Sequence, residues 1–205
     1  MLVTIEGIDG SGKSSLISYL SEALADLEPL MTREPGDSWV GSAVRRAIAE
    51  EIDPVAEALL FVADHAMHLS TVVRPATDAG RLVISDRYTD SRYAYQQVTL
   101  KEYLPNPLEW LRHLHEGWTI PPDLTILLVL PVDVALKRQS ERAGREHFEY
   151  SHLLSEVQEH YLSLAREEPS RFIVIDAEKG EKEVRDFVSA AIRTASSRSR
   201  SRRRH

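Results

Sequence analysis

The sequence contains no cysteine among its 205 residues. Disulfide bonds, thiolate zinc sites, iron–sulfur clusters and a cysteine nucleophile are therefore excluded. Long hydrophobic runs are also missing, because the most apolar stretch, residues 124–136, is interrupted by Thr125, Pro131 and Asp133. It falls short of the ~20 residues that a bilayer requires. The first residues lack the basic and apolar regions of a signal peptide. We therefore expect a cytoplasmic protein with no membrane partner.

Positive charge is scarce outside the C-terminus. The whole chain has a net charge of −7, yet residues 194–205 carry five arginines and no acid, which leaves −12 on residues 1–193. An acidic body is a poor generic binder of nucleic acid. We expect no nucleic-acid partner except through this Ser/Arg-rich tail. The tail has too few apolar residues to bury, so we expect residues 194–205 to be disordered and residues 1–193 to form one domain.

Short apolar runs alternate with longer amphipathic stretches along the domain. The runs lack clean polar/apolar alternation, as is typical of strands that are covered on both faces. This order predicts an α/β fold with a parallel sheet between two layers of helices. The expected strands lie at residues 2–5, 82–85, 124–130 and 172–175, with a weaker candidate at 30–32.

Helices are expected where apolar residues recur at helical spacing. Asp53 is the predicted N-cap of one such helix, with Pro54 at its first position, and the stripe consists of Val55, Ala58, Leu59, Val62, Ala66 and Leu69. The same spacing predicts further helices over residues 16–27 and 153–164.

The strongest motif spans residues 7–14 and matches G-x-x-x-x-G-K-[ST]. It follows a predicted strand and opens a predicted helix, a context in which backbone N–H groups and the helix N-terminus bind phosphate oxygens. In such a loop Lys13 reaches the β- and γ-phosphates and Ser14 offers its hydroxyl to Mg²⁺. The predicted nucleoside triphosphate site consists of Gly7, Ile8, Asp9, Gly10, Ser11, Gly12, Lys13, Ser14 and Ser15.

The P-loop alone does not separate a kinase from a GTPase, a motor or a transporter ATPase. Asp9 helps to separate these classes, because a carboxylate that pointed at the triphosphate would repel the phosphates. We therefore expect Asp9 to face an acceptor hydroxyl.

Three segments in order resemble the thymidylate kinase family. The P-loop carries Asp9, residues 32–36 read Thr-Arg-Glu-Pro-Gly, and residues 86–96 run from Asp-Arg-Tyr through Ser91 to Ala-Tyr-Gln. The resemblance covers about residues 2–190. It implies a P-loop kinase with a five-stranded sheet and a helical lid near residues 138–149. It also implies transfer of the γ-phosphate of ATP to dTMP, with Mg²⁺ as cofactor, by a homodimer.

The resemblance also implies the acceptor site. Arg87 is similar to the family arginine that holds the dTMP phosphate, a task that suits the planar fork of a guanidinium. Phe61 resembles a phenylalanine that stacks on thymine, and His65 stands where the family usually has an arginine that bonds the base edge. Pro35 resembles a proline of the acceptor wall that often follows a cis peptide. The implied acceptor set is Asp9, Glu34, Pro35, Phe61, His65, Arg87, Ser91, Arg92, Tyr95, Gln96 and Phe148.

The lid and metal residues follow from the same resemblance. Because Gly10 stands where part of the family has an arginine, the lid must supply the catalytic arginine. A lid arginine would offset the charge that develops during phosphoryl transfer. Arg142 is the first choice and Arg145 the second, with Arg138 and Arg142 also on ATP; Asp176 and Ala177 resemble the turn beside adenine. The catalytic set is Lys13, Arg87, Arg142, Arg145 and Asp9, and the metal set is Ser14, Asp86 and Glu149.

Two other functions stay open. Another small P-loop kinase, for a deoxynucleoside or a different nucleoside monophosphate, would share most of these motifs. A nucleotide-binding regulator without transfer activity could use the arginine-rich tail for interaction. Asp64, His65 and His68 also raise the option of a metal site, although no further ligand lies near them in the sequence.

Overall fold

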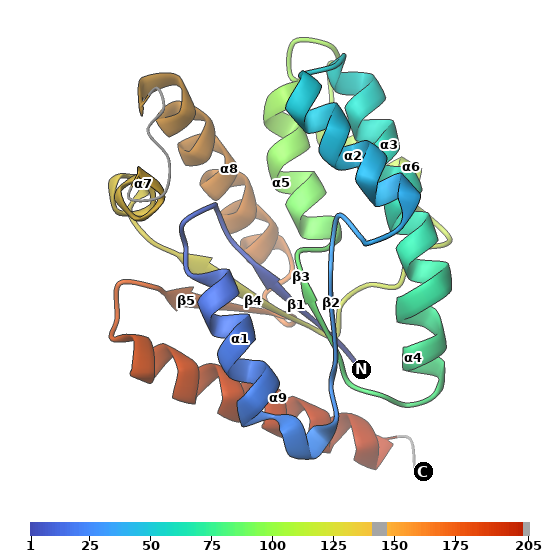
Figure 1. Ribbon diagram of the computed structural model, residues 1–205, viewed down its shortest axis with the longest axis vertical. Coiled ribbons are helices and arrows are strands. Elements are labelled where there is room, and N and C mark those ends of the chain that lie inside the picture. Colours follow the sequence, from blue (N-terminus) through green and yellow to red (C-terminus); the bar gives the residue numbers. More distant parts are fainter. Residues whose placement is uncertain (141–146, 203–205) are drawn as a thin grey trace.

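The computed structural model describes residues 1–140 and 147–202, and the side chains of residues 1–138 and 151–199. Along this described chain, one or more helices separate each strand from the next (Figure 1). In chain order the elements are β1 (Leu2–Glu6), α1 (Lys13–Ala23), a 3₁₀ turn (Ala25–Leu27), β2 (Leu30–Arg33), α2 (Trp39–Glu50), α3 (Pro54–His68), a π-helical turn (Leu69–Val73), α4 (Arg74–Asp78), β3 (Val83–Asp86), α5 (Thr89–Leu100), α6 (Pro107–His115), β4 (Leu124–Val129), α7 (Val132–Ser140), α8 (His147–Glu167), β5 (Phe172–Asp176) and α9 (Glu181–Arg202).

One parallel sheet of five strands, in the order β2-β3-β1-β4-β5, forms the centre of the described chain. β1 lies in the middle and is buried along its whole length, including the polar side chains of Thr4 and Glu6. Ile5 of β1 is in register with Asp86 of β3. The loops that follow β1, β2 and β3 therefore emerge at the same edge. The predicted fold class and all five predicted strands are confirmed.

Helices cover both faces of the sheet (Figure 1). α1 and α9 pack together on one side, and α5 and α8 pack together on the other. The core joins Leu20 of α1 and Ile192 of α9 to Val98 of α5 and Leu154 of α8 through the apolar strands. Among these described helices, none combines the length and apolar character of a membrane span.

The predicted apolar stripe of α3 is only partly buried. Ala58 and Leu69 are buried, whereas Leu59 is 47% exposed and Ala66 is also exposed. The buried face of α3 also carries Asp64, His65 and His68. α3 packs mainly against α2 and α5, and its polar inward face reaches β2 through the hydrogen bond between His68 and Thr32. The prediction was wrong for Leu59 because the spacing of apolar residues cannot identify a helix face that is buried but polar.

The C-terminal boundary also differs from the prediction. α9 continues through the expected tail to Arg202, with Ile192 and Ser196 buried. Arg193 binds Asp26 beyond the end of α1 at 2.7 Å. The structure thus describes a helix over residues 194–202, where the composition of the tail predicted disorder. Extending a helix whose first turns are already packed costs far less than starting one.

Candidate active site

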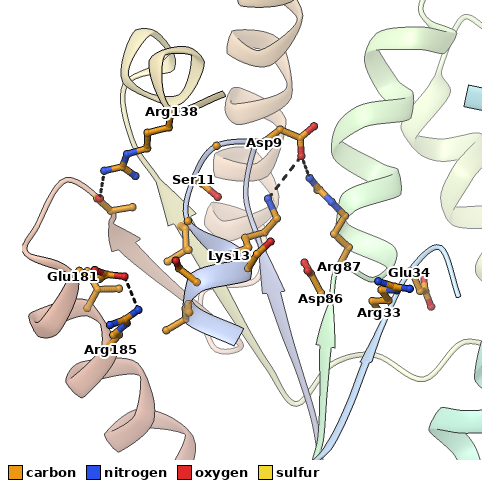
Figure 2. Close-up of a pocket in the computed structure, with 18 of the residues that line it drawn as sticks. Asp9, Ser11, Lys13, Arg33, Glu34, Asp86, Arg87, Arg138, Glu181 and Arg185 are labelled. Atoms are coloured by element: carbon orange, nitrogen blue, oxygen red, sulfur yellow. Dashed lines mark hydrogen bonds and ion pairs between the residues drawn. The ribbon is translucent and has the colours of Figure 1, made fainter. Parts of the chain in front are cut away.

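A cavity of about 780 Å³ opens at the carboxyl edge of the sheet, where parallel α/β folds place ligands. Most of the predicted P-loop residues line it, together with acceptor and lid residues. The predicted residues among its walls are Asp9, Gly10, Ser11, Gly12, Lys13, Ser14, Ser15, Glu34, Pro35, Asp86, Arg87, Arg138 and Ala177. Figure 2 shows Arg138, Glu181 and Arg185 on one side, Arg33 and Glu34 on the other, and Lys13, Asp9 and Arg87 between them.

The loop between β1 and α1 has the tight geometry that its glycines predict. Gly7 and Gly10 have φ values of +139° and +83°, and a Cβ at Gly10 would lie 2.3 Å from the carbonyl oxygen of Ala135. Only glycine meets both demands without strain. The loop encloses Lys13, whose Nζ donates to the carbonyl oxygens of Gly7 at 3.0 Å and Ile8 at 2.9 Å.

Lys13 is poised to respond to an anion. Burial lowers the pKa of Lys13 to about 8, and Arg87 lowers it further, while Asp9 and Asp86 raise it. A phosphate in the cavity would offset this desolvation and keep the ammonium charged. The predicted role of Lys13 therefore has a physical basis in its burial.

The backbone after β3 aims Arg87 into the cavity. Arg87 has a φ of +65°, a left-handed conformation that non-glycine residues seldom adopt. Two hydrogen bonds hold the backbone of Arg87 in this conformation. Its main-chain N–H donates to the carbonyl oxygen of Ile5 at 3.1 Å, and its main-chain carbonyl oxygen accepts from the Ser85 hydroxyl at 2.7 Å. Such conformations cluster at functional sites, where the surrounding structure maintains them.

The guanidinium of Arg87 has two differently bound ends. Nη1 donates to the carbonyl oxygen of Gly7, to Ser91 Oγ at 3.0 Å and to Tyr161 OH at 3.3 Å. Nη2 forms an ion pair with Asp9 and donates to Tyr95 OH at 3.3 Å. The structure therefore places four predicted residues, Asp9, Arg87, Ser91 and Tyr95, in one connected group.

Asp86 and Ser14 line the same cavity and carry side-chain oxygen atoms of the kind that Mg²⁺ prefers. Within the described part of the chain, Asp86 Oδ1 is buried and has no hydrogen-bond partner. Burial raises the pKa of Asp86, whereas Lys13 and Arg87 lower it. Ser14 is exposed at the start of α1 and lines the same cavity. A carboxylate, a hydroxyl and room for water and phosphate oxygens are the usual surroundings of Mg²⁺.

Glu34 is the centre of a buried polar cluster at the other end of the cavity. Its Oε1 accepts from His65 Nδ1 and His68 Nδ1, each at 2.8 Å, and its Oε2 pairs with Arg92. Burial alone would raise the pKa of Glu34, but Arg92 and the two histidines hold it well below its usual range. The next residue, Pro35, follows a cis peptide bond and forms part of the cavity wall.

His65 is held in its neutral form in this cluster. Burial lowers the pKa of His65 to about 4, and Arg92 contributes to the same shift. With Nδ1–H donating to Glu34, Nε2 accepts from Thr119 Oγ1 at 3.0 Å. Both ring nitrogens are thus engaged, so a hydrogen bond from His65 to a base would first require the release of one of them.

Two α5 side chains of the acceptor set have spare hydrogen-bonding capacity. Arg92 and Gln96 stand four residues apart, so they share one face of the helix, and both are buried. Among the described residues, nothing binds Arg92 Nη2 or either polar atom of the Gln96 amide. Unpaired buried donors and acceptors are costly and therefore point to an absent partner.

Some predicted residues are not brought into the cavity or cannot be placed. Phe61 is half-buried on α3 and does not line the cavity. The same holds for seven other residues of the predicted triphosphate and acceptor sets, Gly7, Ile8, His65, Ser91, Arg92, Tyr95 and Gln96. Arg142 and Arg145 lie outside the described residues, as do the side chains of Phe148 and Glu149 in the first turn of α8. Arg138 on α7 donates to the carbonyl oxygen of Ala177 at 3.4 Å. The described residues hold no grouped His, Asp and Glu arranged for a metal ion, so the alternative site at Asp64, His65 and His68 is not found.

Four basic residues of the cavity were missed by the sequence analysis: Arg33, Arg45, Lys179 and Arg185. Arg33 lies inside the Thr-Arg-Glu-Pro-Gly segment and could have been found there. Arg45 on α2 donates to the carbonyl oxygens of Pro35 and Gly36, at 3.2 and 2.9 Å. Nothing local in the sequence distinguishes such a helix arginine from a solvated one.

Comparison with known proteins places the chain in a family. A family model described as thymidylate kinase matches residues 5–188. A probable thymidylate kinase of Methanoculleus marisnigri is 60% identical over 204 residues, covering 100% of both chains. Proteins with the same description from Methanospirillum hungatei and Natronomonas pharaonis are 58% and 49% identical, and the alignments cover 94% to 96% of each chain. The P-loop, the left-handed arginine after β3 and the cis-proline wall thus occur in a chain that belongs to the thymidylate kinase family.

Proposed function

We propose that this protein transfers the γ-phosphoryl group of ATP to dTMP, giving dTDP and ADP. The observation that carries the proposal is the position of Arg87 at the junction of one undivided cavity. The P-loop and Lys13 form the donor side, and Glu34 and Pro35 form the acceptor side. A guanidinium at this junction can hold the phosphate of a nucleoside monophosphate against the donor, whereas a free nucleoside would leave it without a ligand.

Transfer requires alignment and charge neutralisation rather than a covalent intermediate. A phosphate oxygen of dTMP attacks the γ-phosphorus, and the bond to the bridging oxygen of ADP breaks. Lys13 neutralises the charge on the β- and γ-phosphates. Arg87 exchanges its Nη2 contact with Asp9 for the acceptor phosphate, which frees the Asp9 carboxylate to accept from a sugar hydroxyl. The lid arginines Arg142 and Arg145 are proposed to close over the γ-phosphate.

Mg²⁺ would be held by Ser14 and Asp86, with Glu149 near its water shell, and would supply charge neutralisation on the donor phosphates. The unpaired Asp86 oxygen described above supports this assignment. Arg138 is proposed to contact ATP, and Ala177 to lie beside adenine, since both line the cavity at its α9 end.

The base end of the acceptor site is assigned to α3 and α5. Phe61 and Phe148 are proposed to pack on the nucleoside. Arg92 and Gln96 supply the buried donors and acceptor that a pyrimidine edge can satisfy. The neutral His65 then orients Glu34 and does not itself contact the base.

A homodimer and a cytoplasmic location belong to the same proposal. α2 and α3 pack side by side and expose three large apolar side chains, Trp39 (76% exposed), Ile48 (47%) and Leu59 (47%). A second copy of the chain would cover them. Cytoplasm is where ATP and dTMP are both present.

The test is a coupled assay of ADP release with dTMP, dUMP, dCMP, dGMP and thymidine as acceptors. We expect the highest kcat/KM with dTMP and no turnover of thymidine. Preference for another monophosphate would replace the acceptor base in the proposal. Turnover of thymidine but not of dTMP would contradict the role of Arg87.

A further inference from the structure

Glu6 is a completely buried acid that the sequence analysis assigned no role. It is the last residue of β1, immediately before the P-loop. Its Oε2 accepts from Ser91 Oγ at 2.5 Å and from Tyr161 OH at 3.0 Å. Its other oxygen, Oε1, is buried and has no partner within the described chain. A buried acid of this kind is costly to keep, so it calls for a physical reason.

The two hydroxyls that bind Glu6 are the same two that bind Arg87. Arg87 Nη1 donates to Ser91 Oγ at 3.0 Å and to Tyr161 OH at 3.3 Å, and the two hydroxyl oxygens are 2.7 Å apart. Each hydroxyl can accept from the guanidinium and donate to the carboxyl group at the same time. Glu6 and Arg87 are therefore joined by two parallel hydroxyl bridges.

These bridges come from two separate helices. Ser91 belongs to α5, and Tyr161 belongs to α8. Both side chains are buried, and α5 and α8 pack against each other. The bridges thus fix Nη1 to the interior of the protein. By contrast, Nη2 is paired with Asp9, whose side chain is 47% exposed.

We propose that Glu6 and Tyr161 are positioning residues that anchor Nη1 of Arg87 and leave Nη2 free to exchange Asp9 for the acceptor phosphate. This inference rests on the proposed function for the identity of the phosphate carrier. An arginine side chain loses much rotamer freedom when it is ordered for binding. Because the two hydroxyl bridges already order the Arg87 side chain, the acceptor phosphate binds a preorganised guanidinium.

The anchor does not depend on the charge of Glu6. Burial raises the pKa of Glu6 to about 8 and Asp90 adds to the rise, whereas Ser91, Arg87 and Tyr161 lower it. In either protonation state Oε2 can accept from both hydroxyls. Replacement by glutamine retains such an oxygen, whereas replacement by alanine removes the acceptor from both bridges.

The experiment compares Tyr161→Phe, Glu6→Ala and Glu6→Gln for the binding of dTMP by calorimetry and for the KM values of dTMP and ATP. We expect Tyr161→Phe to weaken dTMP several-fold and Glu6→Ala to weaken it at least as much, with the KM of ATP changed less than twofold. Glu6→Gln should restore most of the affinity for dTMP. Tyr161→Phe added to Glu6→Ala should cause little further loss, because both changes break the same bridge.

Tyr161→Phe preserves the ring and its packing, so it tests the bridge even if Glu6→Ala does not fold. Tyr103→Phe, at a side chain 53% exposed beyond α5, is the matched control and should leave every constant unchanged. Unaltered dTMP affinity in Tyr161→Phe, or equal losses for dTMP and ATP, would overturn the inference. A native protein that binds dTMP without transferring phosphate would contradict the proposed function alone, because the binding comparison would still stand.

Discussion

The two ends of the cavity are built in different physical ways. The donor end is built from backbone: glycines with positive φ, a helix N-terminus and carbonyl oxygens around Lys13. The acceptor end is built from buried side chains, with Glu34 fixed by Arg92, His65 and His68. A local motif is enough to specify the first kind of site. The second kind requires several helices to converge, and it couples binding to the stability of the fold.

The largest expected effect is at the donor end. Lys13→Ala should reduce kcat by about 10⁴-fold, within the range reported for single cations that neutralise phosphoryl-transfer charge. The fold should persist, because alanine also removes the desolvation of a buried ammonium. Steady-state kinetics and thermal melting would check both parts. A loss below tenfold would show that backbone groups alone support transfer.

The second largest effect on activity is expected at Arg87, between the two ends of the cavity. Arg87→Ala should lower kcat/KM for dTMP by about 10³-fold, the upper loss seen when one preorganised donor is removed. ATP binding, measured by calorimetry, should change little. Arg87→Lys keeps the charge without the fork and should recover only part of the loss. Equal losses in ATP and dTMP binding would mean that Arg87 serves both ends of the cavity.

The acceptor end should respond to pH through its buried histidines. Burial and Arg92 lower the folded-state pKa of His65 from 6.5 to about 4. Between these values the unfolded chain binds more protons, so stability is fully present above pH 6.5 and falls as the pH drops towards 4. The shift corresponds to about 3 kcal/mol at about 1.4 kcal/mol per pKa unit. Burial also lowers the pKa of His115, to about 3, so His115 adds a further loss of stability as the pH falls.

Urea unfolding at pH 7.5 and 4.5 measures this loss. His65→Gln should reduce the loss between the two pH values, whereas His113→Gln, at an exposed position of α6, should behave like the native protein. An undiminished loss in His65→Gln would assign the pH dependence to other groups.

The smallest expected effect separates binding from stability. Gln96→Leu should stabilise the fold by about 1 kcal/mol, since it removes a buried amide that lacks partners among the described residues. The same change should lower the ratio of kcat/KM for dTMP over dCMP by about tenfold, the value of one to two kcal/mol of discrimination. Urea unfolding and acceptor kinetics measure the two effects.

Gln97→Leu is the matched control for that experiment. Gln97 is the next residue of α5, and its side chain donates to the carbonyl oxygen of Tyr93 at 2.6 Å. Replacement of Gln97 should destabilise the fold slightly and leave the preference for dTMP over dCMP unchanged. Reduced stability in Gln96→Leu would indicate that the amide is satisfied in solution.

Prediction from sequence worked best where one short segment contains the whole signal. The P-loop, the five strands and the fold class depend on contiguous residues. α2 was missed, although Ser38 caps it by accepting from Gly41 N at 3.1 Å and Val40, Val44 and Ala47 are buried at helical spacing. Leu59 was wrongly assigned to a buried face, because the inner side of α3 is polar. Glu6, Arg45 and Tyr161 carried no local signal that marks them as part of a site.

The sequence by itself determined the P-loop half of the cavity, because that half depends on backbone geometry that glycine spacing encodes. Only the tertiary structure decided the acceptor half. It brought Glu34, His65 and Arg92 from β2, α3 and α5 into one buried cluster, and joined Glu6 to Arg87 through hydroxyls of α5 and α8. Burial lowers the pKa of His65 and raises that of Glu6, and burial is a property of the packed chain rather than of any segment.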